Sequence, residues 1–167
     1  MPAVPSPQHD PKWDQSLGEE LANSISHGVG LIAGLIGAPI LMFAAWRGGD
    51  RYFFTGAAVF SAAMLLVYLG STLYHAWPRG TIKSVFQVID HSAIFLLIAG
   101  TYTPVTLGPL RGVWGWSILA LIWGLAIWKV QKEFTSVTTE VPASCFGILN
   151  SFFIVSLAPF FSNLWQT

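Results

Sequence analysis

Long apolar runs separated by short polar stretches make up most of the chain. Five of these runs contain about 20 residues or more, which is enough for an α-helix to cross a hydrocarbon core roughly 30 Å thick. They span residues 25–46, 52–75, 86–107, 110–130 and 142–165. None alternates with a period of two, as the strands of a membrane β-barrel do, and outside a barrel only a helix satisfies its own backbone in lipid. The pattern therefore predicts an all-α protein, a polytopic membrane helical bundle of about five transmembrane helices.

The segment before the first apolar run is polar and rich in proline. Residues 1–15 are predicted to form a disordered leader, and they lack the basic and apolar regions of a cleaved signal peptide. Ser16 and Glu19 fit a capping box, which predicts that a helix begins there and continues into the membrane. Residues 16–167 are predicted to form a single transmembrane helical domain.

Composition and charge support a membrane protein. Hydrophobic residues make up 53% of the chain and charged residues only 10%, whereas about a quarter of a soluble domain is charged. A formal net charge of zero argues against nucleic acid as a partner. The single cysteine, Cys145, excludes an intramolecular disulfide and a zinc site built on cysteines.

Lysine and arginine predict the orientation. With the N-terminus inside, the inner side carries five basic residues, and these are Lys12, Arg79, Lys83, Lys129 and Lys132. The outer side carries three, which are Arg47, Arg51 and Arg111. Because cytoplasmic loops carry an excess of Lys and Arg, the bias predicts a cytoplasmic N-terminus and a cytoplasmic connection over residues 76–85.

Polar side chains gather at three predicted helix ends. They are Glu20, Asn23 and His27 at the start of the first helix, Ser71 and His75 at the end of the second, and Asp90 and His91 at the start of the third. The spacing within each of the first two groups places its members on one helix face. In an up-and-down topology these three ends lie on the same side of the membrane, so we expect the side chains to share one site.

Each residue also fits a simpler role. Glu20 is compatible with a solvated first-turn acid, and Ser71 with a hydroxyl bonded to the carbonyl of Val67. Asn23 fits a helix-packing amide, and the histidines fit anchors at the membrane interface. His91 lies about 100° around its helix from Asp90 and therefore faces elsewhere. Asp90 is the hardest to explain this way, because an aspartate at the centre of a membrane helix costs roughly 2.5–3.5 kcal/mol.

Together these residue types suit a metal-dependent reaction. A neutral imidazole such as that of His75 is the commonest zinc ligand, and no thiol lies nearby to compete. Asp90 is suited to accept a hydrogen bond from a ligating imidazole or from metal-bound water. Ser71, one helical turn from His75, is placed to orient that water or to stabilise an oxyanion.

The same residues resemble the hemolysin III family, which is related to the progestin and adipoQ receptors. The resemblance rests on Glu19-Glu20-Leu-Ala-Asn23-Ser-Ile-Ser-His27-Gly, on Ser71-Thr-Leu-Tyr-His75, and on the run from Asp90-His91 to Pro104, and it covers about residues 16–134. It implies a bacterial inner (plasma) membrane protein with a zinc ion near the cytoplasmic face. His75 would be a zinc ligand, Asp90 would bind the zinc-bound water, and Ser71 would lie in the site. The implied activity is hydrolysis of a lipid amide, or more loosely a role in membrane lipid homeostasis.

The sequence also departs from the family pattern. The family normally has seven helices, and its last helix carries a His-x-x-x-His pair that supplies two zinc ligands. This chain has no histidine after His91, and its end is expected to be divergent or truncated after about residue 134. Three protein ligands are usual for catalytic zinc, so we expect this chain alone not to hold zinc tightly. A homo-oligomer is one arrangement that would supply the missing groups.

Three functions are therefore open at this point. The first is a zinc-dependent membrane hydrolase acting on a lipid amide. The second is a non-catalytic lipid-sensing or receptor-like membrane protein that uses the same pocket. The third is an ion or proton transporter, which we rank last because transport sites lie near the membrane midplane, whereas these residues lie at helix ends.

Overall fold

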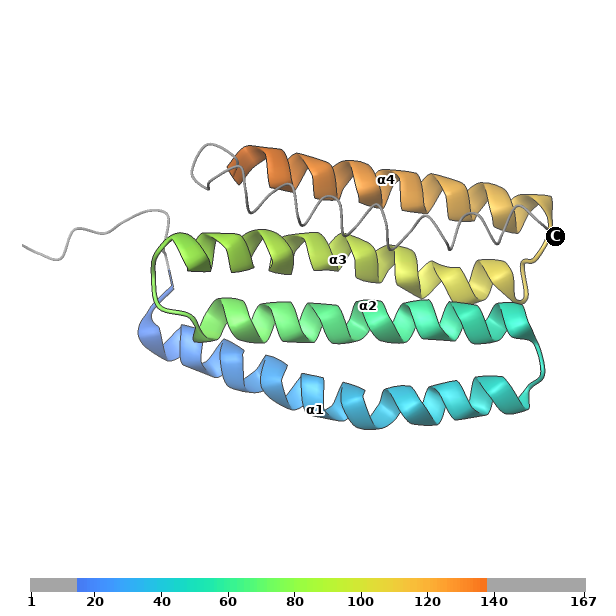
Figure 1. Cartoon of the computed structure of the whole chain (residues 1–167), viewed down its shortest axis with the longest axis horizontal. Helices are drawn as coiled ribbons and strands as arrows, with labels where there is room; N and C mark the ends of the chain where they lie inside the picture. The colour runs from blue at the N-terminus through green and yellow to red at the C-terminus, as the bar shows by residue number, and fades with distance from the viewer. Residues whose placement is uncertain (1–14, 138–167) are drawn as a thin grey trace, which may run out of the picture.

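Four long antiparallel helices form the protein in a computed structural model that describes residues 15–137. They are α1 (Leu17–Arg47), α2 (Arg51–Ala76), α3 (Thr81–Leu107) and α4 (Val113–Val137). Figure 1 shows them side by side in a row, each antiparallel to the next. All four are long and apolar enough to cross a membrane, which confirms the all-α, multi-pass architecture. Residues 1–14 of the predicted leader (residues 1–15) and the predicted fifth helix over residues 142–165 lie outside the described residues.

Two helices begin earlier than the apolar runs predicted. The capping box at the start of α1 is confirmed, because the Glu19 carboxylate accepts from the Ser16 backbone N–H at 2.7 Å and the Ser16 hydroxyl accepts from the Glu19 N–H at 3.4 Å. Helix α3 begins at Thr81 rather than at residue 86, so the connection after α2 is shorter than predicted. The cause is Lys83, whose charge marked the segment as polar although the side chain is only 2% exposed.

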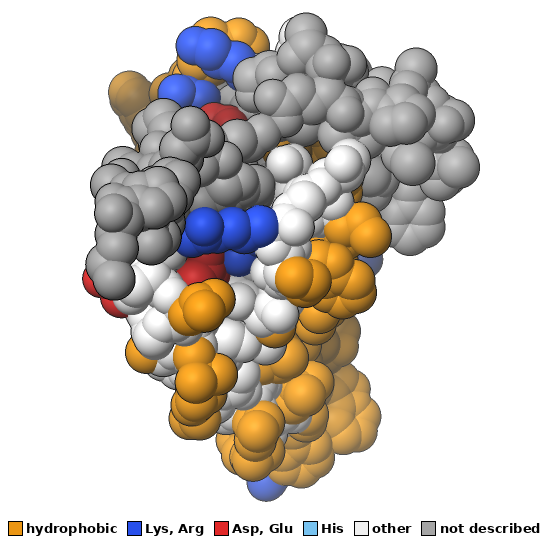
Figure 2. Space-filling model, turned by 90° about the vertical axis from the view of Figure 1, so that its left-hand side faces the viewer, with side chains coloured by type: hydrophobic (Ala, Val, Ile, Leu, Met, Phe, Trp, Pro, Cys, Tyr) orange, Lys and Arg blue, Asp and Glu red, His pale blue; other side chains and the backbone are white. Residues whose placement is uncertain are grey.

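The flanks of the helices are apolar. On α1 the side chains of Leu21, Ile25 and Val29 are each about 60% exposed, and such a surface suits contact with lipid. Figure 2 looks at the end where α1 and α3 begin, and it shows basic and acidic side chains at this end with hydrophobic side chains along the flanks. Charged side chains therefore lie at this end of the helices, and apolar side chains lie along their flanks.

Small residues let neighbouring helices approach closely. Gly56 of α2 lies against the backbone of Pro104 in α3, and Gly100 of α3 lies against Ala63 and Phe60 of α2. Packing on small residues is a common way for membrane helices to associate, because lipid removes the hydrophobic driving force. Among α1–α4, the backbones approach closely only between helices consecutive in the chain.

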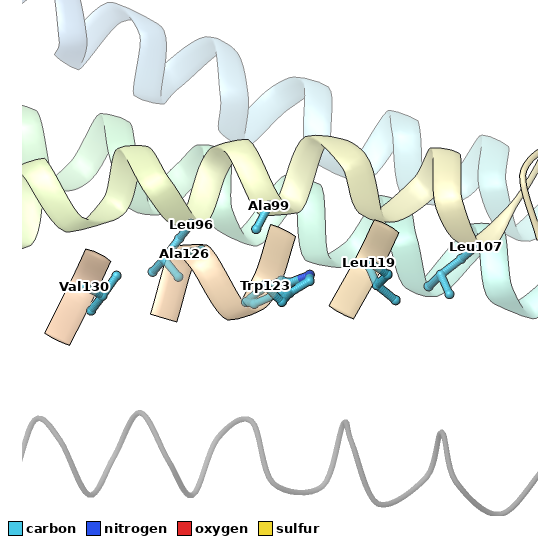
Figure 3. Packing of buried hydrophobic residues seen from close by; sticks show 7 residues of the cluster. All are labelled: Leu96, Ala99, Leu107, Leu119, Trp123, Ala126 and Val130. Carbon is cyan, nitrogen blue, oxygen red and sulfur yellow. The ribbon is translucent and has the colours of Figure 1, made fainter. Parts of the chain in front are cut away.

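The best-buried apolar cluster joins α3 to α4. Its members are Leu96, Ala99, Leu107, Leu119, Trp123, Ala126 and Val130, and Figure 3 shows them between the two helices. The Trp123 indole N–H donates to the Thr103 hydroxyl at 3.2 Å, and that hydroxyl donates to the Ala99 carbonyl at 2.7 Å. This bond satisfies a buried indole N–H and fixes the register of α4 on α3.

Candidate functional site

The start of α1, the end of α2 and the start of α3 lie at the same end of the protein. Figure 1 shows the three ends next to one another, and Figure 2 shows that charged side chains of both signs gather there. The up-and-down topology expected from the sequence therefore places the predicted polar residues on one side.

Three of the charged or ionisable side chains at this end form a buried network. The Nδ1 atom of His75 lies 2.9 Å from one carboxylate oxygen of Glu20, and the Lys83 ammonium lies 2.9 Å from the other. The three side chains are only 8%, 12% and 2% exposed, in the order His75, Glu20, Lys83. Glu20 is therefore a paired internal acid, not a solvated first-turn residue. Because its three members come from α2, α1 and α3, the network ties those helices together.

Lys83 also closes the end of α2. Its ammonium donates to the Tyr74 carbonyl at 2.9 Å and to the Trp77 carbonyl at 3.2 Å. The last carbonyls of a helix have no partner within the helix, and a cation there also interacts favourably with the helix dipole. The ammonium lies 4.7 Å from the centre of the Tyr74 ring as well, a distance suited to a cation–π contact. From the sequence, Lys83 was only one of the basic residues that predicted the orientation, although an acid as buried as Glu20 needs a cationic partner.

His27 joins the network through ring contacts. Its imidazole is nearly parallel to that of His75, with 5.9 Å between ring centres and an angle of 4°. The Tyr74 ring contacts His75 as well, at 4.7 Å between centres. These aromatic neighbours restrict the orientation of the His75 ring.

Asp90 and Ser71 lie buried between α2 and α3. Asp90 is 8% exposed and Ser71 is 4% exposed. A β-carbon built on Gly70 would lie 3.6 Å from the Asp90 Cα, so Asp90 is level with Gly70 and Ser71 on the neighbouring helix. Within residues 15–137 the Asp90 carboxylate has neither a hydrogen bond nor an ion pair. A buried carboxylate without a partner is costly, and it is suited to accept a hydrogen bond from a ligand.

The Ser71 hydroxyl is not bonded to the backbone one turn earlier on its helix, which was the simpler role that the sequence left open. In the described part of the chain it makes no hydrogen bond to the Val67 carbonyl, whereas the neighbouring Thr72 hydroxyl makes the equivalent bond to the Tyr68 carbonyl at 2.6 Å.

The remaining two predicted site residues lie apart from the network. The Asn23 amide donates to the Gln15 side chain at 3.4 Å, so it contacts the chain that leads into α1. His91 is exposed and turns away from Asp90, as the helical geometry predicts. The structure thus brings together Glu20, His27 and His75, and places Ser71 beside Asp90.

Comparison with known proteins identifies the family of this chain. The family model described as haemolysin-III related matches residues 15–166. The chain belongs to the hemolysin III family. It is similar to Hemolysin-3 of Bacillus cereus, with 40% identity over 155 residues that cover 92% of this chain and 71% of that protein. It is also similar to the Hemolysin-3 homolog of Bacillus subtilis (strain 168), with 34% identity over 151 residues covering 89% and 71% of the two chains. No solved structure matches.

The extent of the match corrects one expectation. We expected the resemblance to the hemolysin III family to end at about residue 134, but the family model continues to residue 166. Hydrophobic segments of membrane proteins diverge while keeping their composition, and short motifs alone therefore underestimated the length of the similarity. The chain nevertheless spans only 71% of the length of the two relatives.

The described residues of this hemolysin III protein do not by themselves fit a zinc ion. Within residues 15–137 no three His, Cys, Asp or Glu side chains converge in a way that would hold a metal. The Glu20 carboxylate already pairs with Nδ1 of His75, and the second oxygen of that carboxylate pairs with the Lys83 ammonium. His75 therefore has one ring nitrogen left, whereas three protein ligands are usual for catalytic zinc.

Proposed function

We propose that this integral membrane protein of the hemolysin III family recognises a membrane lipid through the polar site at one end of its helices. The observation that carries the proposal is the Asp90 carboxylate, which is buried beside Ser71 and has no partner among residues 15–137. An ionised carboxylate accepts hydrogen bonds only. The ligand is therefore a lipid whose headgroup carries N–H or O–H donors, such as a lipid amide.

The surroundings of the site also favour an amphiphilic ligand. The polar network occupies one end of the row, and the exposed apolar side chains of Leu21 and Ile25 begin next to Glu20 on α1. A lipid placed there would set its headgroup against the polar residues and its acyl chain along α1. A small soluble ligand would make no use of this apolar surface.

We place the protein in the bacterial inner (plasma) membrane with its N-terminus and the α2–α3 connection in the cytoplasm. Two considerations support this placement. The first is the excess of Lys and Arg on that side, and the second is the family itself. The polar site then faces the cytoplasmic leaflet.

Zinc-dependent hydrolysis of a lipid amide is the second candidate function. Family membership supports it, together with the presence of His75, Ser71 and Asp90 at one end of the protein. Because residues 15–137 lack a full ligand set, this candidate requires ligands from outside these residues, for which a homo-oligomer is one source.

A lipid-binding experiment tests the proposal. The full chain, purified in detergent, is titrated with a fluorescent ceramide-type amide, and Asp90→Asn is compared with His91→Gln, an exposed neighbour on α3. Hydrogen bonds to a charged group contribute about 1.5–3 kcal/mol, so Asp90→Asn should weaken binding roughly 10- to 100-fold. His91→Gln should bind like the wild type.

Three results would overturn or redirect the proposal. Unchanged affinity in Asp90→Asn, or no saturable binding by the wild type, would show that the site does not recognise the headgroup. Release of free fatty acid from the same amide would separate hydrolysis from binding alone. Retention of helix content by both variants is checked by circular dichroism.

A further inference from the structure

The contact between His75 and Glu20 determines which ring nitrogen of His75 is free. The Nδ1 atom lies 2.9 Å from the Glu20 carboxylate. A carboxylate has no proton to donate, so Nδ1 must carry the proton of this hydrogen bond. In a neutral imidazole the lone pair is then on Nε2.

We infer that Glu20 and Lys83 are positioning residues that hold His75 in the tautomer protonated at Nδ1, so that Nε2 carries the lone pair and is left as an acceptor. The Glu20 carboxylate, which receives the Nδ1 proton, is itself paired with the Lys83 ammonium 2.9 Å away.

Lys83 contributes by fixing Glu20. The two oxygens of the carboxylate are held by different helices, one by His75 on α2 and the other by Lys83 on α3. Lys83 is itself anchored, because it also donates to the carbonyls of Tyr74 and Trp77. The carboxylate therefore cannot rotate away from His75 without losing a buried ion pair.

Ring contacts complete the positioning. The parallel ring of His27 and the tilted ring of Tyr74 both contact the His75 imidazole. A carboxylate that receives the proton of one imidazole nitrogen fixes the tautomer and the orientation of the ring. Glu20 is thus placed to act through His75 and not to contact the ligand itself.

The inference deepens the proposed function and rests on it only for the identity of the ligand. An Nε2 lone pair is a group that would accept a hydrogen bond from a lipid N–H or O–H. The tautomer itself is a property of the protein alone. It can be measured without added lipid, so its failure is distinguishable from failure of lipid recognition.

The test is nitrogen NMR of the full chain labelled with 15N-histidine in detergent micelles at neutral pH. The sequence has four histidines, and His75→Gln identifies the signals of His75. The two tautomers give opposite patterns of coupling between ring nitrogens and carbon-bound protons. We expect the pattern of a ring protonated at Nδ1, whereas free imidazole in water favours the proton on Nε2.

Matched variants test the roles of the acid and the lysine. In Glu20→Ala the nitrogen signals of His75 should shift to the opposite tautomer, and in Lys83→Met they should shift part of the way. Glu19→Ala removes the neighbouring acid, which pairs with Ser16 and not with His75, and it should leave the pattern unchanged. Lys83→Arg keeps the cation and should retain the wild-type tautomer.

Either of two outcomes would overturn the inference. One is a wild-type His75 protonated at Nε2, a result that needs no variant and does not depend on the folding of one. The other is an unchanged tautomer in a folded Glu20→Ala protein, which would show that the contact does not set the proton position.

Discussion

Gly56 offers a quantitative test of the packing between α2 and α3. A β-carbon at this position would lie 2.7 Å from the backbone nitrogen of Pro104 and closer still to its Cα, whereas ordinary contacts are 3.4–4 Å. The obstructing atoms are backbone, so no side chain can turn aside. Gly56→Ala must therefore push α2 away from α3 by several tenths of an ångström or more.

The expected loss follows from the packing. Overpacking in a close-packed interior costs about 1–3 kcal/mol, and up to about 1 kcal/mol of this is offset by the better helix propensity of alanine. Gly37→Ala on α1 is the matched control, because a β-carbon there meets nothing within 4 Å. Unfolding in mixed micelles of increasing SDS content, followed by far-ultraviolet circular dichroism, measures both variants.

Gly56→Ala should unfold at a clearly lower SDS mole fraction than the wild type, and Gly37→Ala at the same fraction or a higher one. Equal midpoints for Gly56→Ala and the wild type would refute the close approach of the two helices. An equal loss in both variants would show that glycine flexibility, not the approach to Pro104, decides stability.

Three further predictions concern other parts of the chain. Thr103→Val leaves the buried Trp123 N–H without its acceptor and should lower the free energy of unfolding by about 1–2 kcal/mol in the same SDS assay; an unchanged midpoint would contradict this. A cysteine at Arg79, introduced in a Cys145→Ser background, should resist a membrane-impermeant maleimide in intact cells and react after permeabilisation, and efficient labelling of intact cells would reverse the orientation. The purified chain should retain well below about one zinc per chain, as the usual need for three ligands requires, and a stoichiometric zinc lost in His75→Ala would show that the ligand count is incomplete.

The fold was largely predictable because lipid leaves few alternatives for the backbone. The run over residues 52–75 corresponds to α2 within one residue at each end, since both neighbours of that run are polar turns. The predicted start of α3 at residue 86 was wrong for a specific reason. Hydropathy treats Lys83 as exposed, and it carries no information about Glu20, which lies on another helix and makes the burial of Lys83 tolerable.

The site was predictable in its location but not in its bonding. Helix topology alone placed Glu20, His75 and Asp90 on one side of the membrane, and the structure agrees. Helix topology does not indicate that His75 pairs with Glu20 while Asp90 has no partner among residues 15–137. Such pairing depends on the rotation of each helix about its own axis, which is set by contacts such as that of Gly70 with α3.

The row in which the described helices pack backbone to backbone only with their neighbours in the chain has a consequence for assembly. Apart from the Glu20–Lys83 ion pair to α3, the α1–α2 hairpin has its described helix packing available as soon as α2 enters the bilayer, so α1 and α2 need not wait for α4. Interfaces of this kind behave nearly independently, as in repeat proteins, and stability is close to a sum over adjacent pairs. Damage at the α3–α4 surface should therefore leave the pairing of α1 with α2 in place, and biogenesis can proceed in the order of synthesis.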